Sequence, residues 1–198
     1  RDVRSLYASL PQYAYNLGKA KQALARSRYP NGFTATLPYP DSRQILGKAA
    51  LALSQSLKQI GITLNVKQIT TDAWFNILYS HPKPMGLQVV SWDITYPDPS
   101  EITHFLLDGK YATPNAFNTS NYRNAAMDRL LAQQERAASA ATRRSLMVRI
   151  IRQAARDLPY LPIWYQQVGM AIDSRYTYND FGIWYIYTPW ALSISPRG

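Results

Sequence analysis

A compact run of polar and aromatic side chains, made up of Trp92, Asp93, Thr95 and Tyr96, follows shortly after the mostly apolar residues 87–90. The indole and phenol rings offer amphipathic stacking surfaces, and the carboxylate and hydroxyl groups offer polar contacts. Groups of this kind bind and orient a small molecule in a groove. The run therefore predicts ligand-binding residues, with Asp93 and Thr95 as the weaker candidates.

Structural roles compete with ligand contact at each of these positions. Trp92 is equally suited to be a core aromatic beneath the turn, because tryptophan is seldom fully buried and often lines grooves. Tyr96 precedes Pro97, which favours an extended backbone and a ring exposed toward a cleft. Asp98 is better suited to cap a helix than to contact a ligand.

A second group of candidates lies in the irregular, polar stretch 108–122. From this stretch, Asn118 and Tyr122 are predicted to reach the ligand. Asparagine-rich loops are commonly turns, so a purely local role for Asn118, Asn121 and Tyr122 is the alternative.

The sequence offers little for catalysis. It has no Gly-x-Ser-x-Gly elbow, no glycine loop that would cradle a phosphate or dinucleotide, no His-Glu-x-x-His motif and no Cys. Its two histidines stand apart, His81 beside prolines and His104 inside an expected helix, and its acidic residues form no paired-carboxylate site. We therefore expect a binding protein that is not an enzyme, with no cofactor and no metal site.

The elements around the turn are predicted to hold it at a sheet edge. Residues 87–90 read as a strand covered on both faces, and residues 98–101, Asp-Pro-Ser-Glu, read as a capping box that starts a helix. Ile102, Phe105 and Leu106 fall on one face of that helix and should pack back against the sheet. The turn would then lie at the carboxyl end of the strand, where open α/β sheets bind ligands.

Helix and strand patterns alternate along the rest of the chain. Expected helices cover 16–28, 42–59, a short stretch from 72, 124–138 and 140–158, and expected strands cover 33–37, 62–69 and 163–172. Such alternation implies crossover connections and a largely parallel sheet. The last two helices should form an antiparallel hairpin beside the sheet. Asn16, Asp41 with Ser42, and Asp72 are the expected N-caps, and Gly61 should end the second helix.

Composition narrows the class of protein. The 198 residues, 46% of them hydrophobic, suffice for one lobe, and no apolar run reaches the length of a membrane span. The chain begins Arg-Asp-Val-Arg, which resembles neither a signal peptide nor an initiating Met, so we expect a piece of a longer protein.

The net charge of +10 raises the possibility of an anionic partner. Residues 123–156 hold eight arginines against two carboxylates. Arg149, Arg152 and Arg156 are spaced three and four apart, opposite an apolar stripe, which favours an ordinary solvated helix face over a phosphate-binding surface. We therefore expect no nucleic-acid partner.

Several segments together resemble the family 5 solute-binding proteins of ABC transporters. The matching segments are residues 15–33, 57–62, 92–99, 128–131, 143 with 146, and 157–163. They follow the family's order over nearly the whole chain, and the Trp and Tyr-Pro-Asp-Pro turn at 92–99 is one of them.

The resemblance implies an α/β fold, the second lobe of a type II periplasmic-binding-protein-like protein, with a mixed, mostly parallel sheet flanked by helices. Residues 1–163 would form this solute-binding lobe. Residues 164–198 would form a crossover strand and a C-terminal tail that returns toward a first lobe, which this chain lacks.

The resemblance also implies a function. The lobe would capture an oligopeptide or a related small solute outside the cytoplasm, in the periplasm or at a membrane-anchored cell surface, and present it to an ABC permease. The alternative is a sensory or regulatory module, because the same fold is also found attached to DNA-binding domains in some regulators.

For the site, the resemblance implies that Trp92 and Tyr96 face the cleft. Peptide-binding members place an Asp three residues after the Trp to pair with the peptide amine, and here that position is Thr95. A charged hydrogen bond contributes about 1.5–3 kcal/mol, so its absence counts against recognition of a free amino terminus. Asp93 would substitute only if the turn differs.

Overall fold

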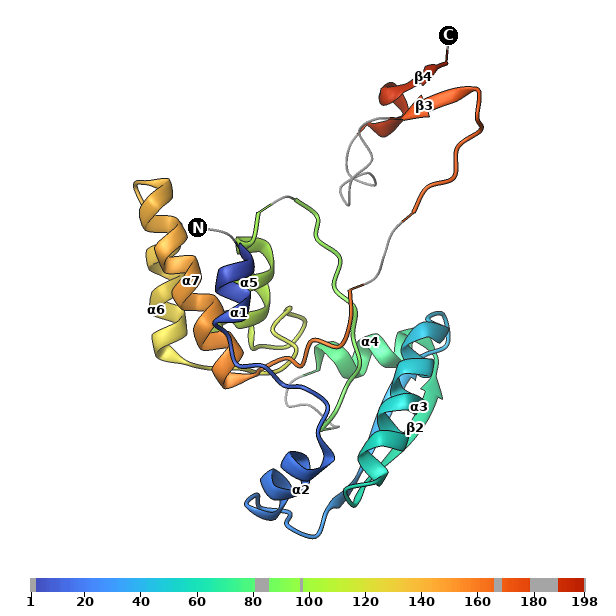
Figure 1. The fold of residues 1–198 in the computed structure, drawn as a ribbon, viewed down its shortest axis with the longest axis vertical. Coiled ribbons are helices and arrows are strands. Elements are labelled where there is room, and N and C mark those ends of the chain that lie inside the picture. Colours follow the sequence, from blue (N-terminus) through green and yellow to red (C-terminus); the bar gives the residue numbers. More distant parts are fainter. Residues whose placement is uncertain (1–2, 81–85, 97, 166–168, 179–188, 198) are drawn as a thin grey trace.

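The computed structural model of the protein describes residues 3–80, 86–96, 98–165, 169–178 and 189–197 (Figure 1). His81, Pro97 and the middle of the strand expected at 163–172 lie outside these ranges, as does much of the tail.

One packing unit is a βαβ arrangement. Strand β1 (Phe33–Pro40), helix α3 (Gln44–Lys58) and strand β2 (Ile62–Ile69) follow one another, and the strands pair in parallel from Phe33↔Ile62 to Pro40↔Ile69. Helix α3 lies along this pair (Figure 1). The core is apolar and buried, formed by Leu37, Leu46, Ala50, Ile62, Leu64 and Val89. The parallel crossover predicted from the sequence is confirmed here.

Of the first two predicted N-caps, one is confirmed and the other is wrong. Helix α1 (Val3–Ala8) precedes α2 (Leu17–Ala25), and Asn16 caps α2 as predicted, because its side chain accepts from the amide of Lys19 at 2.8 Å. The predicted cap of α3 is wrong. Asp41 instead accepts from the amide and hydroxyl of Thr71, and α3 starts after Arg43 without a side-chain cap.

Helix α4 (Thr71–Tyr79) starts two residues earlier than a helix capped by Asp72 would. Thr70 supplies its cap by accepting from the amide of Ala73, so Asp72 lies in the first turn and is not the cap. At the end of α3, Gly61 has a φ of +89°, and its amide donates to the carbonyl of Lys58. The predicted role of Gly61 is therefore confirmed.

The strand predicted at 87–90 is wrong: these residues are irregular. A strand requires a hydrogen-bonded neighbour, and the described parallel sheet consists of β1 and β2. The apolar residues of this segment serve packing instead, because Val89 is buried and Leu87 partly buried in the βαβ core.

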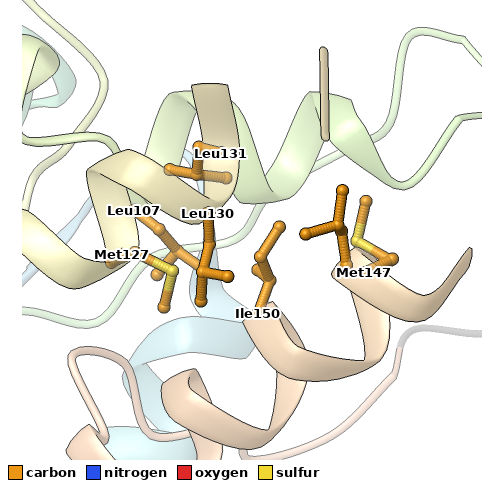
Figure 2. Packing of buried hydrophobic residues seen from close by; sticks show 7 residues of the cluster. Leu107, Met127, Leu130, Leu131, Met147 and Ile150 are labelled. Atoms are coloured by element: carbon orange, nitrogen blue, oxygen red, sulfur yellow. The ribbon is translucent and has the colours of Figure 1, made fainter. Parts of the chain in front are cut away.

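Three helices form a second packing unit (Figure 2). Helices α5 (Ser100–Leu107), α6 (Ala125–Glu135) and α7 (Ala140–Asp157) bury Leu107, Met127, Leu130, Leu131, Leu146, Met147 and Ile150. The α6–α7 hairpin is confirmed, but it packs with α5 around its own core. The expected packing of α5 on the sheet is also wrong, because Ile102 is exposed and Leu107 joins the helical core.

Arg149, Arg152 and Arg156 are exposed on α7, which confirms the solvated face. In the part of the chain that the structure describes, no helix combines the length and the apolar character needed to cross a membrane.

The C-terminal segment extends away from both units (Figure 1). It holds a 3₁₀ turn (Trp190–Ser193) and an antiparallel pair, β3 (Tyr176–Tyr178) with β4 (Ile194–Pro196). The strand expected at 163–172 is wrong for the residues described there, 163–165 and 169–172, which are irregular. Among the described residues, no neighbouring strand pairs with 163–165 or 169–172.

Candidate functional site

The turn after residue 91 is held by one buried carboxylate. Glu101, with 2% of its surface exposed, accepts from the Thr95 amide at 2.9 Å and 2.8 Å, from the Thr95 hydroxyl at 2.6 Å and from the Tyr96 amide at 3.2 Å. The predicted capping box would have aimed Glu101 at the amide of Asp98, which instead donates to the Tyr96 carbonyl. That part of the prediction is wrong, because Glu101 reaches farther back along the turn.

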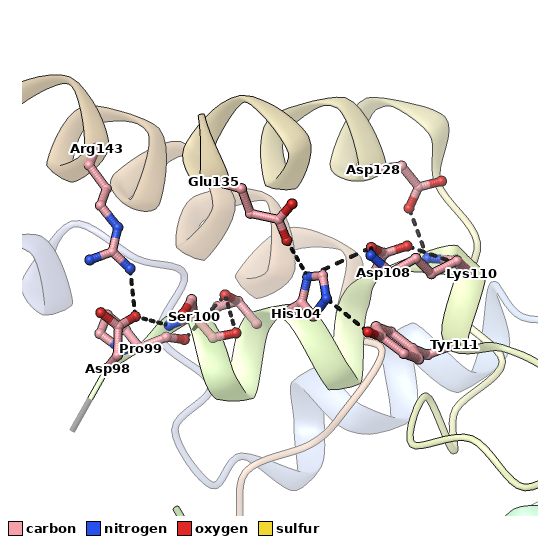
Figure 3. A network of polar contacts seen from close by, with 12 residues as sticks. Asp98, Pro99, Ser100, His104, Asp108, Lys110, Tyr111, Asp128, Glu135 and Arg143 are labelled. Atoms are coloured by element: carbon pink, nitrogen blue, oxygen red, sulfur yellow. Dashed lines mark hydrogen bonds and ion pairs between the residues drawn. The ribbon is translucent and has the colours of Figure 1, made fainter. Parts of the chain in front are cut away.

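The predicted N-cap role of Asp98 is also wrong: Pro99 occupies the N-cap position of α5, and Asp98, one residue earlier, gains a distant partner. Its carboxylate accepts from the amide of Ser100 at 2.8 Å and from the guanidinium of Arg143 at 2.6 Å (Figure 3). The hydrogen bond from Arg143 holds the pKa of Asp98 well below its ordinary value. Helix α7 is thereby tied to the start of α5.

Farther along α5, His104 joins two helices (Figure 3). Its Nδ1 lies 2.7 Å from Oε1 of Glu135 on α6, and its Nε2 lies 3.0 Å from the hydroxyl of Tyr111, in the short 3₁₀ helix Gly109–Tyr111. Asp108 stands 3.8 Å from Nδ1 and pairs with Lys110 at 3.1 Å. These contacts make the histidine part of the scaffold. No group of three or more metal-ligating side chains occurs within the described ranges.

Trp92 lies among aromatic rings at the boundary between the two packing units. Its ring centroid is 6.5 Å from that of Phe105 and 5.5 Å from that of Phe117. Its Nε1 is buried and has no acceptor in the described part of the chain. An apolar pocket of about 130 Å³ is lined by Trp92 together with Trp74, Leu106 and others.

A polar groove of about 420 Å³ lies beside the same turn. Tyr96, which is 42% exposed, lines it together with Ser100, His104 and Arg143. The turn therefore presents Trp92 to an apolar pocket and Tyr96 to a polar groove, two surfaces of opposite chemistry.

The remaining predicted residues lie elsewhere or have structural contacts. Asp93 and Thr95 are exposed on the turn. Asn118 is 2% exposed and donates to the carbonyls of Asp108 and Tyr122, so it organises its own loop. Tyr122 donates its hydroxyl to Asp157, and burial together with that carboxylate raises its pKa. The structure thus brings Trp92, Asp93, Thr95 and Tyr96 together, and places Asn118 and Tyr122 in the supporting loop.

Sequence reasoning missed two residues that shape the turn, Glu101 and Arg143. The sequence pattern assigns Glu101 to a local cap, and it singles out Arg143 only as part of a segment that resembles the solute-binding family. A signal for Glu101 exists in its spacing, because a glutamate one turn into a helix can also reach residues before the cap. Arg143 lies 45 residues from Asp98, so no local signal identifies the pair.

Comparisons with known proteins identify the family that this chain matches. Residues 4–113, more than half of the chain, match the family described as bacterial extracellular solute-binding proteins, family 5 Middle. The glutathione-binding protein GsiB of Shigella dysenteriae serotype 1 is 25% identical over 184 residues, covering 89% of this chain and 34% of that protein.

Two solved structures share the fold, and each is 26% identical in sequence to this chain over the aligned residues. The periplasmic binding protein DppA of Helicobacter pylori, in complex with the peptide STSA, aligns with a TM-score of 0.71 and 26% identity over 78% of this chain and 30% of its own. The substrate-binding protein CtaP of Listeria monocytogenes aligns with a TM-score of 0.76 and 26% identity over 86% of this chain and 34% of its own.

These similarities confirm the α/β, type II periplasmic-binding-protein-like fold predicted from the sequence. The chain spans about a third of the length of the relatives it matches. It carries the family's matching region from residue 4 to residue 113, including the turn between Trp92 and Asp98. The chain belongs to the bacterial extracellular solute-binding proteins, family 5.

Proposed function

We propose that this chain is the second lobe of a binding protein that captures a peptide or a related small solute outside the cytoplasm for import by an ABC transporter. The family match over residues 4–113 carries the proposal. Support comes from the relatives, one named for glutathione binding and one solved with a bound peptide. These relatives are transport-associated binding proteins and lend no support to a regulatory module.

The site of this lobe is the turn at Trp92, Asp93, Thr95 and Tyr96. Trp92 would cover an apolar side chain of the ligand, and Tyr96 would contact the ligand from the polar groove. Asn118 and Tyr122 would contribute by holding the neighbouring loop, since their polar groups are bound within the protein. Capture and release require no covalent chemistry, which fits a protein that is not an enzyme and uses no cofactor.

Residues 1–163 would form this solute-binding lobe, and residues 164–198 would return toward a first lobe of the same protein. Large apolar side chains are exposed along and just before the C-terminal segment, with Leu161 at 70%, Tyr165 at 93% and Leu192 at 85%. Apolar surface of this kind marks an interface with another protein surface. A hinge between two lobes would then close over the ligand, and a membrane permease would receive it.

The test is calorimetric titration of the natural gene product that carries this chain with glutathione, tetra-alanine and a mannose oligosaccharide. We expect micromolar binding of a peptide and no binding of the sugar. Tyr96→Ala should weaken binding about tenfold or more through lost ring contact. Tyr29→Ala, an exposed tyrosine on the far loop before β1, serves as the control. Lack of binding by both peptides would contradict the proposal.

A further inference from the structure

Two tryptophans on the wall of the apolar pocket carry hydrogen-bond donors that lack an acceptor. Trp74 is 3% exposed and Trp92 is partly buried, and the Nε1 atom of each is buried without a partner in the described part of the chain. Folded proteins rarely leave such donors unpaired, and an indole N–H can only donate. Both residues border the pocket, so a hydrogen-bond acceptor inside it would lie against both.

Arg43 brings a positive charge to the same pocket. Its guanidinium donates to the hydroxyl of Ser91, a neutral group, and it forms no ion pair within the described ranges. Burial raises the pKa of the neighbouring Tyr79 phenol, and the charge of Arg43 acts against that rise. Among the described residues that line the pocket, none is Asp or Glu. The wall therefore holds a cation and unpaired donors, and it lacks an anion of its own.

The size and the remaining walls of the pocket limit the group that it admits. Apolar side chains supply much of the lining, namely Phe75, Leu78, Val90 and Leu106. The volume is about 130 Å³, whereas a single buried water needs about 10–15 Å³ of such space. A carboxylate on a short apolar stem fits both the room and the walls. The main chain of a peptide fits poorly, because its amide groups would be buried without partners.

We infer that the apolar pocket selects ligands with an acidic side chain, whose carboxylate accepts hydrogens from Trp74 and Trp92 and pairs with Arg43. The apolar walls, Trp92 among them, cover the stem of that side chain, and the donors hold its end. The inference rests on the proposed function and names the class of peptide or related solute that this lobe prefers. Trp74 and Arg43 thereby become specificity-determining residues.

The experiment compares peptides that differ in one side chain. The natural gene product is titrated calorimetrically with tetra-alanine in which one residue, at each position in turn, is glutamate, glutamine or methionine. The three side chains are similar in length, but glutamine keeps the acceptor without the charge, and methionine lacks both. We expect a position at which the glutamate peptide binds about tenfold tighter than the methionine peptide, with the glutamine peptide between them.

Variants of the pocket assign the preference to its donors. Arg43→Gln should reduce the preference for glutamate over glutamine to less than about twofold, and Arg43→Lys should retain part of it. Trp74→Phe keeps an aromatic wall, removes one donor and should reduce the preference for glutamine over methionine. Arg144→Gln, at an exposed position on α7, makes the same change of charge away from the pocket and should alter neither preference.

One further result would assign Arg43 to structure alone. Equal loss of affinity for all three peptides in Arg43→Gln would overturn the inference, since it would leave the preference unchanged. If Trp74→Phe does not fold, Arg43→Gln decides the matter, because Arg43 is exposed and its replacement leaves the buried tryptophans in place.

Amidated peptides separate the side-chain carboxylate from the one at the end of the peptide. Amidation of the carboxyl terminus should leave the preference for glutamate over methionine unchanged. If amidation instead abolishes the effect of Arg43→Gln, the cation serves the peptide terminus, and the inference is overturned. Equal binding of all three peptides also overturns it and leaves peptide binding in place. Binding of none of them overturns the proposed function and the inference together.

Discussion

At the level of single residues, Arg143 connects helix α7 to the turn. Its guanidinium donates to the carboxylate of Asp98, and that hydrogen bond is the main cause of the lowered pKa of Asp98. A group whose pKa is lower in the folded protein stabilises the fold when it is ionised. The contribution is fully present above about pH 4, the ordinary value for an aspartate, and is lost as the pH falls toward the lowered pKa.

Replacing Arg143 with Gln should therefore lower the free energy of unfolding by about 1 kcal/mol at pH 7, since both partners are partly exposed. The difference from the natural protein should shrink as the pH falls from about 4 to 2, because Asp98 of the unfolded chain takes up a proton in this range while the lowered pKa keeps Asp98 of the folded protein ionised. Urea unfolding across this range measures it. Arg144→Gln, the exposed neighbour, should show no such pH dependence. A difference that stays constant down to pH 2 would refute the role of this pair.

At the level of elements, two glycines set the entry into the parallel strands. Gly32 and Gly61 precede β1 and β2, and both have positive φ angles, +88° and +89°. A Cβ at position 32 would stand 1.9 Å from the carbonyl oxygen of Gly61, whereas one at position 61 would approach nothing closer than 3.5 Å. A residue with a Cβ would be strained by the positive φ at either position, but only at position 32 would the Cβ also clash with another residue.

Gly61→Ala should cost about 1–2 kcal/mol from the left-handed backbone alone. Gly32→Ala should cost at least twice as much, because the added carbon forces the two strand entries apart. Denaturant midpoints of both variants, measured in the same buffer, test this order. Equal losses would mean that the strand entries separate without resistance.

The stability of the helical unit depends on Ile150, a residue of α7 that is completely buried in the core that α7 shares with α6. Ile150→Ala should lower the free energy of unfolding by about 2–5 kcal/mol through lost burial and the cavity left behind. Ile102→Ala, at an exposed position on α5, should cost less than about 1 kcal/mol. Chemical unfolding followed by far-ultraviolet circular dichroism compares them. A small effect at Ile150 would contradict the packing in Figure 2.

At the level of the whole molecule, the proposed function makes the described fold one wall of a binding cleft. In this proposal, Trp92 on the apolar pocket and Tyr96 on the polar groove would face a second wall supplied by the first lobe. A ligand held by one wall forfeits the contacts of the second, and apolar burial is what drives binding in such sites.

The chain by itself should therefore bind glutathione or tetra-alanine only weakly, with a Kd of about 1 mM or higher. The natural gene product should bind the same peptide in the micromolar range. Calorimetry on both proteins under one set of conditions makes the comparison, and a circular dichroism spectrum of the chain controls for its folding. Micromolar binding by the chain alone would show that one wall suffices and would contradict the two-lobe arrangement.

The sequence predicted structural features that depend on residues close together in the chain. The cap Asn16, the helix end at Gly61 and the hairpin of α6 and α7 follow from contacts between residues a few positions apart, which the order of the sequence reveals directly. The parallel crossover followed from alternating patterns of helix and strand. The position of the turn between residues 92 and 98 was predicted for the same reason.

Tertiary structure decided what depends on partners far away in the chain. Residues 87–90 had the composition of a strand, but a strand also needs a neighbour that offers free hydrogen-bonding groups. Glu101 bonds to the exposed turn instead of the nearer amide of Asp98. Its side chain makes four hydrogen-bond contacts with donors of Thr95 and Tyr96 there. Arg143 met Asp98 only through the packing of α7 beside α5. The sequence thus determined most of the local elements and the position of the turn at 92–98, and packing determined the electrostatics within that turn.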